Sequence, residues 1–506
     1  MTHAWERSRK EWRRPGILHF ALVIAWACLL APDHARAQGC AGVPTSTTGA
    51  VVWTPQWCDE FNATTAGPPS TTTWNFDLGN NNGWGNNELE VYCGPPGYPD
   101  NPAQCPTSFD PATSNAYVDG LGHLVIQAIN SDGTWTSARL NTNTSPTPTT
   151  FQYGRIEASE KLPVGAGLWP AFWALGSNFA TVAWPTCGEM DLMENVLAPG
   201  GLAPNLIRST VHGGSSPTNC YCGANGLGQD YKFPSGVDVT SFHVYGAIWS
   251  PNMVQFYVDS PNNVFFIVTA SDVPPGFQWA FNHPFIALTN LAVGGSYAGP
   301  PNARTPNPAM MLVDYVRYYQ AAAVPAPTLS VQSNMTITAG DTTDNTNEIS
   351  LSSSSGTGRV YLQCTTNAPL TGCSINTGTT LNPNVADFTT SSTGTATVIL
   401  ATTAHSLLTP LVFNPKVRLW TPIAASALML LLLALTGLHG RGSLRRWTRG
   451  AALAGLLMAG VIVASCGSAT GTGTAAGVYT VTVNAYTETG NGSSPDATVS
   501  FTLTVN

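Results

Sequence analysis

The segment CGEMDLMEN (187–195) contains three carboxylates, Glu189, Asp191 and Glu194, among apolar residues. Only 9% of the 506 residues are charged, so three acids within six positions are unusual for this chain. Side chains alternate between the two faces of a strand, which places Glu189 and Asp191 on one face and Glu194 on the other. A β-bulge at 192–193 adds one residue and returns Glu194 to the first face. The spacing therefore predicts a bulged strand with all three acids on one side.

Three carboxylates on one face repel each other unless they share protons or their pKa values move apart, so the arrangement needs a chemical reason. Glycoside hydrolysis supplies one, because it uses two carboxyl groups that flank the bond, about 5–5.5 Å apart in a retaining enzyme. Four effective strand steps separate the Cα atoms of Glu189 and Glu194 by roughly 13 Å, and the bend of a bulge shortens the gap between their carboxyl groups. This geometry favours retention over inversion. A metal site is the alternative, disfavoured because no histidine or further aspartate lies close in sequence, and an acidic strand without chemistry is the third interpretation.

The overall charge points to a neutral polar ligand. The chain has 28 acidic and 20 basic residues and a net charge of −8, with no face rich in lysine and arginine. Such a surface is unsuited to gripping phosphates, so we expect no nucleic-acid partner.

The first 37 residues have the pattern of an export signal. A basic start leads into the apolar run ILHFALVIAWACLLAP, and the small-residue pattern Ala35-Arg36-Ala37 predicts cleavage before Gln38. The alternative, a membrane anchor, is disfavoured because the run is short for a span. In an exported chain the cysteines are expected to form disulfides, of which Cys364–Cys373 is the simplest pair. Seven cysteines between residues 40 and 222 leave at least one of them free or paired elsewhere.

The text from about residue 51 to 319 is a series of short strands separated by Gly, Pro and Asn clusters, with β-branched and aromatic residues in each strand. It contains no convincing long amphipathic helix, which predicts an all-β sandwich or barrel. The segment AAAVPAP (321–327) is expected to be a linker. Residues 328–412 are rich in Thr and Ser and are expected to form a small immunoglobulin-like β-sandwich.

Two apolar runs interrupt this second β region. Residues 420–438 are long enough to span a bilayer, an arginine-rich loop follows, and residues 451–465 form the second run. Runs around a basic loop predict a transmembrane helical hairpin (420–465) with its loop in the cytoplasm. Residues 473–506 read as two strands, and we expect them to complete the immunoglobulin-like domain, because an isolated hairpin is marginally stable. The catalytic part would then be exported, extracellular or periplasmic, and tethered to the cytoplasmic membrane.

Several blocks of the chain resemble glycoside hydrolase family 16, in particular its laminarinase (endo-β-1,3-glucanase) branch. Besides GEMDLMEN, which matches the bulged E-x-D-x-x-E form, these blocks are GWGNNELEVYC, YGRIEASEKLPVGAGLWPAFWALG, STVHG, PFIALTNLAVGG and DYVRYYQ, in the expected order. The resemblance covers about residues 50–320 and implies a catalytic domain at 38–320. It also implies a jelly-roll (concanavalin-like) β-sandwich with an open cleft.

The resemblance implies roles for the acids. Glu189 is expected to be the nucleophile that forms a covalent glycosyl-enzyme, and Glu194 the acid/base. Asp191 is expected to hold a proton or hydrogen bond that tunes the nucleophile. The expected substrate-binding residues are Trp84, Asn87, Arg155, Trp169, Trp173, His212 and Asn290. For the two tryptophans of LWPAFW and for His212, a purely structural role is the alternative.

No cofactor is expected for catalysis. Family members often carry a structural calcium ion, and the equivalent ligands here would be Glu60, the Gly120 carbonyl and Asp314, since calcium prefers oxygen ligands. The expected activity is endo-hydrolysis of a β-1,3-linked glucan. Other family activities (agarase, carrageenase, lichenase or transglycosylase) and a non-catalytic glucan-binding protein are the alternatives. The bulged strand argues against lichenase, and the GWGNNELEVY block favours β-1,3-glucan.

Overall fold

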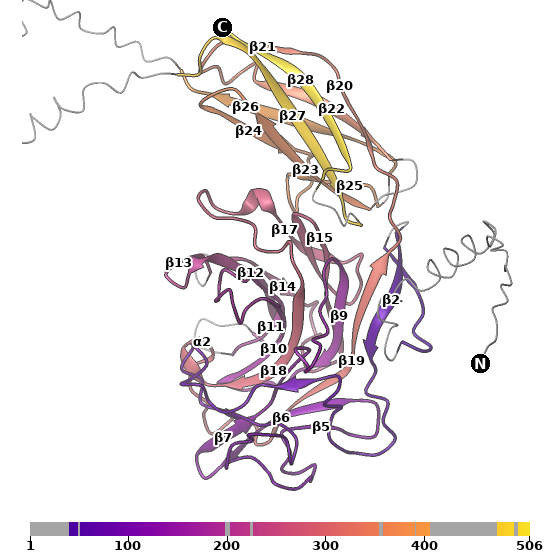
Figure 1. Cartoon of the computed structure of the whole chain (residues 1–506), viewed down its shortest axis with the longest axis vertical. Coiled ribbons are helices and arrows are strands. Elements are labelled where there is room, and N and C mark those ends of the chain that lie inside the picture. The colour runs from indigo at the N-terminus through magenta and orange to yellow at the C-terminus, as the bar shows by residue number, and fades with distance from the viewer. Residues whose placement is uncertain are drawn as a thin grey trace, which may run out of the picture.

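Figure 1 shows two bodies of β-structure along the long axis of the molecule. The structure is a computed structural model, and it describes residues 40–48, 51–197, 203–222, 226–353, 358–389, 391–404, 473–489 and 494–506. Residues up to Ala321 form the first domain. Residues from Thr328 onward form the second domain. Both consist almost entirely of strands, which confirms the prediction of an all-β chain.

Two large sheets form the first domain, and nearly all of their strand pairs are antiparallel. One sheet has eleven strands in the order β17-β16-β15-β9-β19-β6-β7-β4, with β2 beside β19, β1 beside β2, and β5 beside β6. Its bounds are β1 Ser46–Thr48, β2 Val51–Asp59, β4 Val91–Tyr92, β5 Ala116–Val118, β6 Leu124–Ser131, β7 Thr134–Ser137, β9 Gly154–Lys161, β15 His243–Ser250, β16 Met253–Val258, β17 Val264–Thr269 and β19 Ala309–Ala321.

The other sheet has eight strands in the order β13-β12-β11-β10-β18-β8-β3, with β14 beside β12. Its bounds are β3 Asn75–Phe76, β8 Arg139–Asn141, β10 Leu168–Gly176, β11 Glu189–Glu194, β12 Leu206–Ser216, β13 Asn219–Tyr221, β14 Leu227–Lys232 and β18 Phe285–Val293. Two short helical segments, η3 (Ala270–Asp272) and α2 (Gly295–Ala298), join strands of this domain.

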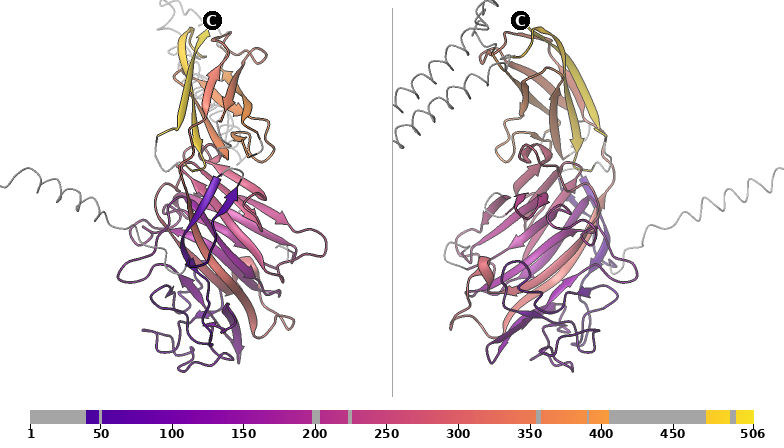
Figure 2. Two further views of the ribbon diagram at one scale, coloured as in Figure 1. Left: turned by 90° about the vertical axis from the view of Figure 1, so that its right-hand side faces the viewer. Right: turned by 60° about the vertical axis from the view of Figure 1, so that its left-hand side comes forward.

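The main core lies between these two sheets, whose stacking is visible in Figure 2. Every second residue of a strand enters it: on β10 these are Leu168, Phe172 and Ala174, and on β9 they include Ile156 and Ala158. The alternate residues of the eight-stranded sheet point the other way. We call this outward side, which carries Glu189, Asp191 and Glu194, the site face.

The second domain is a sandwich of a four-stranded sheet, β20-β22-β26-β24, and a five-stranded sheet, β21-β28-β27-β23-β25. Its bounds are β20 Thr328–Val331, β21 Met335–Ile337, β22 Thr346–Ser352, β23 Arg359–Thr366, β24 Thr371–Asn376, β25 Val385–Asp387, β26 Thr393–Thr402, β27 Gly477–Thr487 and β28 Ala497–Val505. β27 and β28 are central to the five-stranded sheet, with β27 pairing with β23 and β28 with β21.

Two predictions fall on residues that the structure does not describe. The export signal (1–37) and the membrane hairpin (420–465) lie outside the described residues. Among the helices of the described residues, none is long and apolar enough to cross a membrane.

Four disulfides cross-link the described residues: Cys40–Cys58, Cys93–Cys105, Cys220–Cys222 and Cys364–Cys373. The last pair and the presence of one free cysteine in the first domain were both expected from the sequence. The free cysteine is Cys187, which is buried. Disulfides of this number are typical of an oxidising compartment.

A glutamate lies inside the main core. Glu160 on β9 has no exposed surface, and Thr289 Oγ1 on β18 donates to its Oε1 at 3.2 Å. Its other oxygen and the buried hydroxyl of Tyr245 have no hydrogen-bond partner among the described residues. Burial raises the pKa of Glu160 to about 8, and the Thr289 hydrogen bond lowers it in part. The carboxyl group is therefore neutral in the folded protein at pH 7.

This raised pKa makes stability depend on pH. Between an unfolded pKa of about 4.5 and a folded pKa of about 8, the folded state holds a proton that the unfolded state releases. The contribution of Glu160 is thus complete below about pH 4.5 and is lost as pH rises through 8. We expect Glu160→Gln to be more stable than the wild type at pH 9 by at least about 1.4 kcal/mol, the value of one pKa unit, and similar to it at pH 5.

Denaturant unfolding of both chains at pH 5, 7 and 9 measures this difference. Asp132→Asn is the control, because it makes the same chemical change at an exposed turn where the backbone φ of 53° suits asparagine. An equal effect of Glu160→Gln at all three pH values would contradict the interpretation.

Candidate active site

The catalytic strand expected from the sequence is β11, and it is bulged. Its pairing with β12 is regular up to Asp191 and resumes at Glu194, with a register shift between the two. Leu192 and Met193 are adjacent, yet both enter the main core and are at most 1% exposed. The extra residue therefore puts Glu189, Asp191 and Glu194 on the site face, as the spacing predicted.

The neighbouring strand β12 presents a partner to each acid. His212 lies opposite Glu189, Thr210 opposite Asp191, and Arg208 opposite Glu194. These pairs share a face because residues directly opposite in a sheet point the same way. One histidine and one arginine are therefore close to three carboxylates that otherwise only repel each other.

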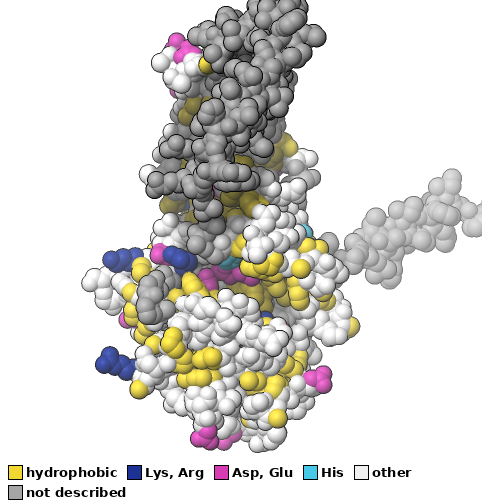
Figure 3. All heavy atoms as spheres, turned by 90° about the vertical axis from the view of Figure 1, so that its left-hand side faces the viewer, with side chains coloured by type: hydrophobic (Ala, Val, Ile, Leu, Met, Phe, Trp, Pro, Cys, Tyr) yellow, Lys and Arg dark blue, Asp and Glu magenta, His cyan; other side chains and the backbone are white. Residues whose placement is uncertain are grey.

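His212 contacts the first two acids. Its Nε2 lies 2.9 Å from Asp191 Oδ2 and 3.7 Å from Glu189 Oε1. The ring of Trp184 is centred 6.3 Å from the imidazole, and its indole lowers the pKa of Glu189 by a hydrogen bond. Figure 3 shows acidic side chains beside a histidine in the upper part of the first domain. The ligand-type atoms of Glu189, Asp191 and His212 lie within 4.8 Å of one another, so this is the group of described residues that could hold a metal ion.

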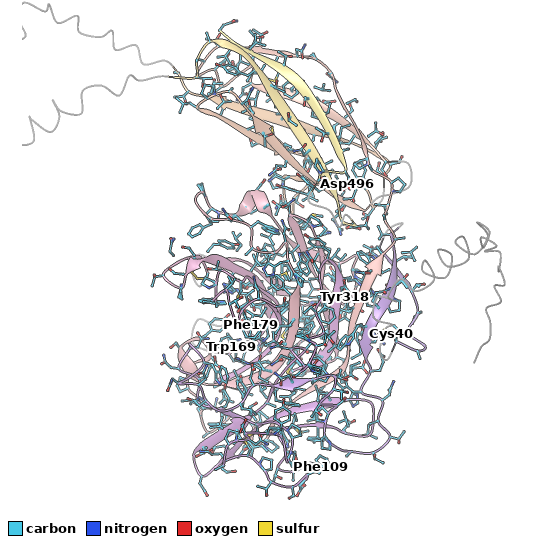
Figure 4. The ribbon with its side chains drawn as sticks, viewed as in Figure 1. Cys40, Phe109, Trp169, Phe179, Tyr318 and Asp496 are labelled. Carbon is cyan, nitrogen blue, oxygen red and sulfur yellow. A yellow bond between two sulfur atoms is a disulfide. The ribbon has the colours of Figure 1, made fainter. Side chains whose placement is uncertain are left out.

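Glu194 has different neighbours. Trp169 Nε1 donates to its Oε1 at 3.0 Å, and the Trp169 ring packs edge-on against Tyr297 of α2 with centroids 4.9 Å apart. Trp169 lies beside α2 in Figure 4. Arg208 is held by Asp230, whose Oδ1 accepts from Nε at 2.7 Å. Glu194 therefore has an aromatic wall on one side and a fixed positive charge on the next strand.

Burial dominates the electrostatics of the three acids. It raises the pKa of Glu189, Asp191 and Glu194 to about 8. The charge of Asp191 raises the pKa of both glutamates further, while His212 lowers both. Because each negative charge makes the next ionisation harder, the group holds protons near neutral pH. A proton donor and a carboxylate can therefore coexist here.

Trp169 and Trp173 lie on the site face together, as expected if LWPAFW is a strand. Pro170 lies between them in β10, a central strand, where proline is normally excluded. Its carbonyl accepts from Asn195 N at 3.3 Å on the β11 side, so the position of its missing N–H also faces that side, just beyond the end of β11. Only the reciprocal hydrogen bond to Asn195 is missing, at the end of this ladder, and β10 continues unbroken.

A second polar group adjoins Trp173. Trp173 Nε1 donates to Asn290 Oδ1 at 2.7 Å, and Asn290 Nδ2 donates to the Tyr92 hydroxyl at 3.2 Å. The Arg139 guanidinium lies 5.6 Å from the Trp173 ring and 4.1 Å from the Trp84 ring. The structure thus brings Trp84, Trp173 and Asn290 together around Arg139, next to the acids, since Trp173 pairs with Asp191.

Trp84 and Asn87 share a loop whose backbone is strained. Both have positive φ, 49° and 57°, and for a bulky residue such as Trp84 this conformation is an outlier. Two contacts fix the loop: Trp84 Nε1 donates to Gly79 O at 3.1 Å, and Asn87 Nδ2 donates to Ser296 Oγ at 2.9 Å. Asn87 is therefore held beside α2, on the Glu194 side of the site.

The structure does not bring Arg155, a predicted substrate-binding residue, to the acids. Arg155 lies on β9 of the eleven-stranded sheet, and because Ile156 enters the core, Arg155 points to the opposite side, away from the acids. Its guanidinium stacks 3.8 Å from the Tyr319 ring centroid, and its Nε lies 3.5 Å from Glu157 Oε2. Arg155 is therefore buried against the outer side of the eleven-stranded sheet, where its contacts are structural.

One of the expected calcium ligands, Glu60, is paired with an arginine. Both carboxylate oxygens of Glu60 accept hydrogen bonds from Arg317, at 2.8 and 2.6 Å. A calcium ion would compete with this guanidinium for the same oxygens. Glu60 as placed is engaged by Arg317, and calcium at Glu60, Gly120 and Asp314 stays a prediction.

Four site residues were missed from sequence: Arg139, Arg208, Trp184 and Tyr297. Arg208 had a readable signal, because it precedes STVHG and shares the parity of Thr210 and His212. Trp184 lies in a loop and Tyr297 in a short helix. Neither segment has a repeating pattern of side chains from which the direction of the residue could be predicted. The sequence argument against a metal also missed His212, which strand pairing brings to the acids from a position 21 residues after Asp191.

An open sheet carrying two glutamates, Glu194 buried and Glu189 half-buried, with aromatic rings and amides beside them, has the features of the glycosidase class of hydrolases. A family model for glycosyl hydrolases family 16 matches residues 112–307. The chain is 33% identical to a β-glucanase of Rhodothermus marinus over 281 residues, which are 53% of this chain and 85% of that protein. It is 34% identical to glucan endo-1,3-β-glucosidase A1 of Niallia circulans over 292 residues, 52% of this chain and 37% of that protein.

Among solved structures, the endo-β-1,3-glucanase of Pyrococcus furiosus is 37% identical and covers 56% of this chain and 100% of its own, with a TM-score of 0.46. The identity to the Rhodothermus protein over most of its length is decisive. The chain belongs to glycoside hydrolase family 16, and its first domain is a glycoside hydrolase.

We expect Glu189→Gln to abolish hydrolysis and Glu194→Gln to lower kcat by about 10²–10⁴, the usual contribution of a general acid. Glutamine keeps the shape and removes one of three crowded charges, so the melting temperature should be unchanged or higher. Initial rates and thermal unfolding of each variant test this. Glu160→Gln, the same change in the core, is the control and should retain activity. Wild-type turnover by either site variant would overturn the assignment.

Proposed function

We propose that the chain is a retaining endo-glycosidase that cleaves β-1,3-linked glucan of the laminarin type. The observation that carries the proposal is the bulge of β11, which puts two glutamates on the site face with separate partners. The names of the Niallia and Pyrococcus relatives support the choice of linkage. The GWGNNELEVY block, now seen as the loop that carries Trp84, supports the same choice.

The proposed reaction is a double displacement. The Glu189 carboxylate attacks the anomeric carbon, and the bond to the leaving glycosidic oxygen breaks as that oxygen takes the proton of Glu194. A covalent glycosyl-enzyme forms. Glu194, now ionised, removes a proton from water, which attacks the same carbon and releases Glu189.

The neighbours of each acid fit these separate roles. Asp191 and His212 form an ion pair beside Glu189, and this pair can hold the proton that would otherwise neutralise the nucleophile. Burial and the charge of Asp191 raise the pKa of Glu194 to about 8, which keeps this group protonated near neutral pH. Trp169 fixes its carboxyl orientation.

We propose that the sugar rings of the substrate bind over Trp84, Trp173 and Asn290. Aromatic rings match the C–H faces of glucose, and the amide supplies hydrogen bonds. Each of these polar groups already makes a hydrogen bond within the protein. That bond fixes the orientation in which the group meets a neutral ligand. Another activity of family 16 (agarase, carrageenase, lichenase or transglycosylase) is the alternative, and so is a non-catalytic glucan-binding role.

Laminarin, lichenan, agarose and carrageenan distinguish these alternatives when each is incubated with the purified full chain. We expect new reducing ends from laminarin first, with a fall in mean chain length that precedes the appearance of glucose. Proton NMR of the initial product should show the β-anomer, as retention requires. Glu189→Gln is the control. An initial α-anomer would exclude the double displacement, and binding without reducing ends would favour the non-catalytic alternative.

We propose that the first domain is a jelly-roll sandwich, that the second is immunoglobulin-like, and that the catalytic domain is exported and tethered through residues 420–465. Thr403 and Thr474 support an insertion, because they exchange two hydrogen bonds: Thr403 N donates to Thr474 Oγ1 at 2.9 Å, and Thr474 N donates to Thr403 O at 2.8 Å. The chain therefore leaves and re-enters the second domain at one point, so a long insertion leaves the sandwich intact.

Epitope tags test the tether. One tag after Asn506 and another in the arginine-rich loop at 440–448 are exposed to protease on spheroplasts. We expect the C-terminal tag to be cleaved and the loop tag to be protected until lysis, because the hairpin would place only the loop in the cytoplasm. A C-terminal tag that is shielded in intact spheroplasts would exclude the topology.

A further inference from the structure

The second domain contacts the first through a buried apolar cluster. Met253 and Ile267 of β16 and β17 pack against Tyr361, Val385 and Tyr486 of the second domain. All five are at most 8% exposed, and the rings of Tyr361 and Tyr486 stack with centroids 5.7 Å apart. In Figure 1 these elements meet where β23 and β25 adjoin β15 and β17. The contact therefore excludes water, as the core of a domain does.

A polar group beside the cluster is satisfied only across the interface. Gln255 of β16 has no exposed surface. Its amide Nε2 donates to Glu488 Oε2 at 3.0 Å, and its carbonyl accepts from Arg359 Nη1 at 3.2 Å. Both partners belong to the second domain, so each hydrogen-bonding end of this first-domain side chain is used there. Asp496, labelled in Figure 4, lies at the same end of the second domain.

Two second-domain residues, Tyr361 of the cluster and Asn382, hold η3. The Tyr361 hydroxyl lies 2.7 Å from Ser271 Oγ. Asn382 Nδ2 lies 2.8 Å from Asp272 Oδ2 and 3.2 Å from the Ile267 carbonyl, as a donor to both. Asp272 is the residue that caps η3, since its Oδ2 also accepts from Thr269 N at 2.7 Å. The second domain therefore binds the cap of this segment as well as its side chains.

The segment that follows η3 runs to the site. The Gln278 carbonyl accepts from the Tyr221 hydroxyl of β13 at 3.1 Å, and the Phe281 carbonyl accepts from Trp249 Nε1 at 2.9 Å. A Cβ at Gly188 would lie 2.9 Å from the Ala280 carbonyl, so this backbone packs directly behind the residue that precedes Glu189. The cap at η3 is thus the start of the segment that supports the first catalytic acid.

We propose that the second domain is a clamp for the segment 264–281 of the catalytic domain, so that the two domains unfold as one unit. The proline-containing linker would otherwise suggest an independent module, and interfaces between domains of one chain are usually polar enough to let them move. Here the linker is also fixed, since Val324 packs against the first domain and its N–H donates to Thr489 Oγ1 at 3.2 Å. The proposal is independent of the substrate.

Val385→Asp tests the clamp in the full chain. Val385 belongs to the interface cluster and not to the core of its own domain, so a charge there should separate the domains without unfolding the second. We expect one calorimetric transition for the wild type and two for the variant. Val478→Asp is the matched control, because it makes the same change in the same domain at a side chain that is 71% exposed. A single transition for Val385→Asp at the wild-type temperature, or two transitions already in the wild type, would overturn the proposal.

Asn382→Ala is the milder variant, for the case in which the charge unfolds the chain. It removes the hydrogen bonds to Ile267 and Asp272, together with the one that Asn382 Oδ1 accepts from Asn384 N within the second domain. We expect hydrogen exchange in the peptide 264–281 to accelerate by about tenfold, which corresponds to roughly 1.4 kcal/mol of local opening, while β10 and β18 stay protected. Unchanged exchange in this peptide would show that the second domain does not clamp it.

Discussion

The bulge in β11 is the constraint on which the site depends, and the main core maintains it. Leu192 and Met193 are adjacent and both buried, which a regular strand does not allow. Straightening the strand would expose one of them, at a cost of about 1.5–3 kcal/mol, and would turn Glu194 into the apolar core. Burying a carboxylate without partners costs more than that. Hydrophobic burial on one face therefore fixes the positions of the acids on the other.

The same interaction explains why the site was readable from a short segment. The parity argument for Glu189, Asp191 and Glu194 uses only strand alternation and one extra residue, both of which are local. The strands around it were equally readable, because their β-branched and aromatic runs end at turn residues. The disulfide Cys364–Cys373 was predictable for a similar reason, since its members are only nine positions apart and few alternatives lie nearby.

Features that depend on pairing between distant segments were not readable. Arg155 is one residue from a core position on a strand of the other sheet, and sequence gave no means of telling the two sheets apart. His212 and Arg208 reach the acids only because β12 pairs with β11 in one register. The tie between Glu60 and Arg317 joins residues 257 positions apart. In each case the local pattern was right and the partner was set by topology.

The relation between the two domains follows the same rule. The alanine and proline composition of the linker is a property of its seven residues alone, and it predicts that the two domains are separate. Independence is decided instead by how much apolar surface and how many polar groups the domains bury against each other. Gln255 has both of its hydrogen-bonding ends bound by the second domain, and Met253 and Ile267 have lost contact with water beside it. β17 is the edge strand of the eleven-stranded sheet, and its Ile267 carbonyl accepts from Asn382, so the second domain also occupies part of an edge that would otherwise be open to pairing with another chain. The catalytic sandwich is thus closed on this side by a neighbour from its own chain.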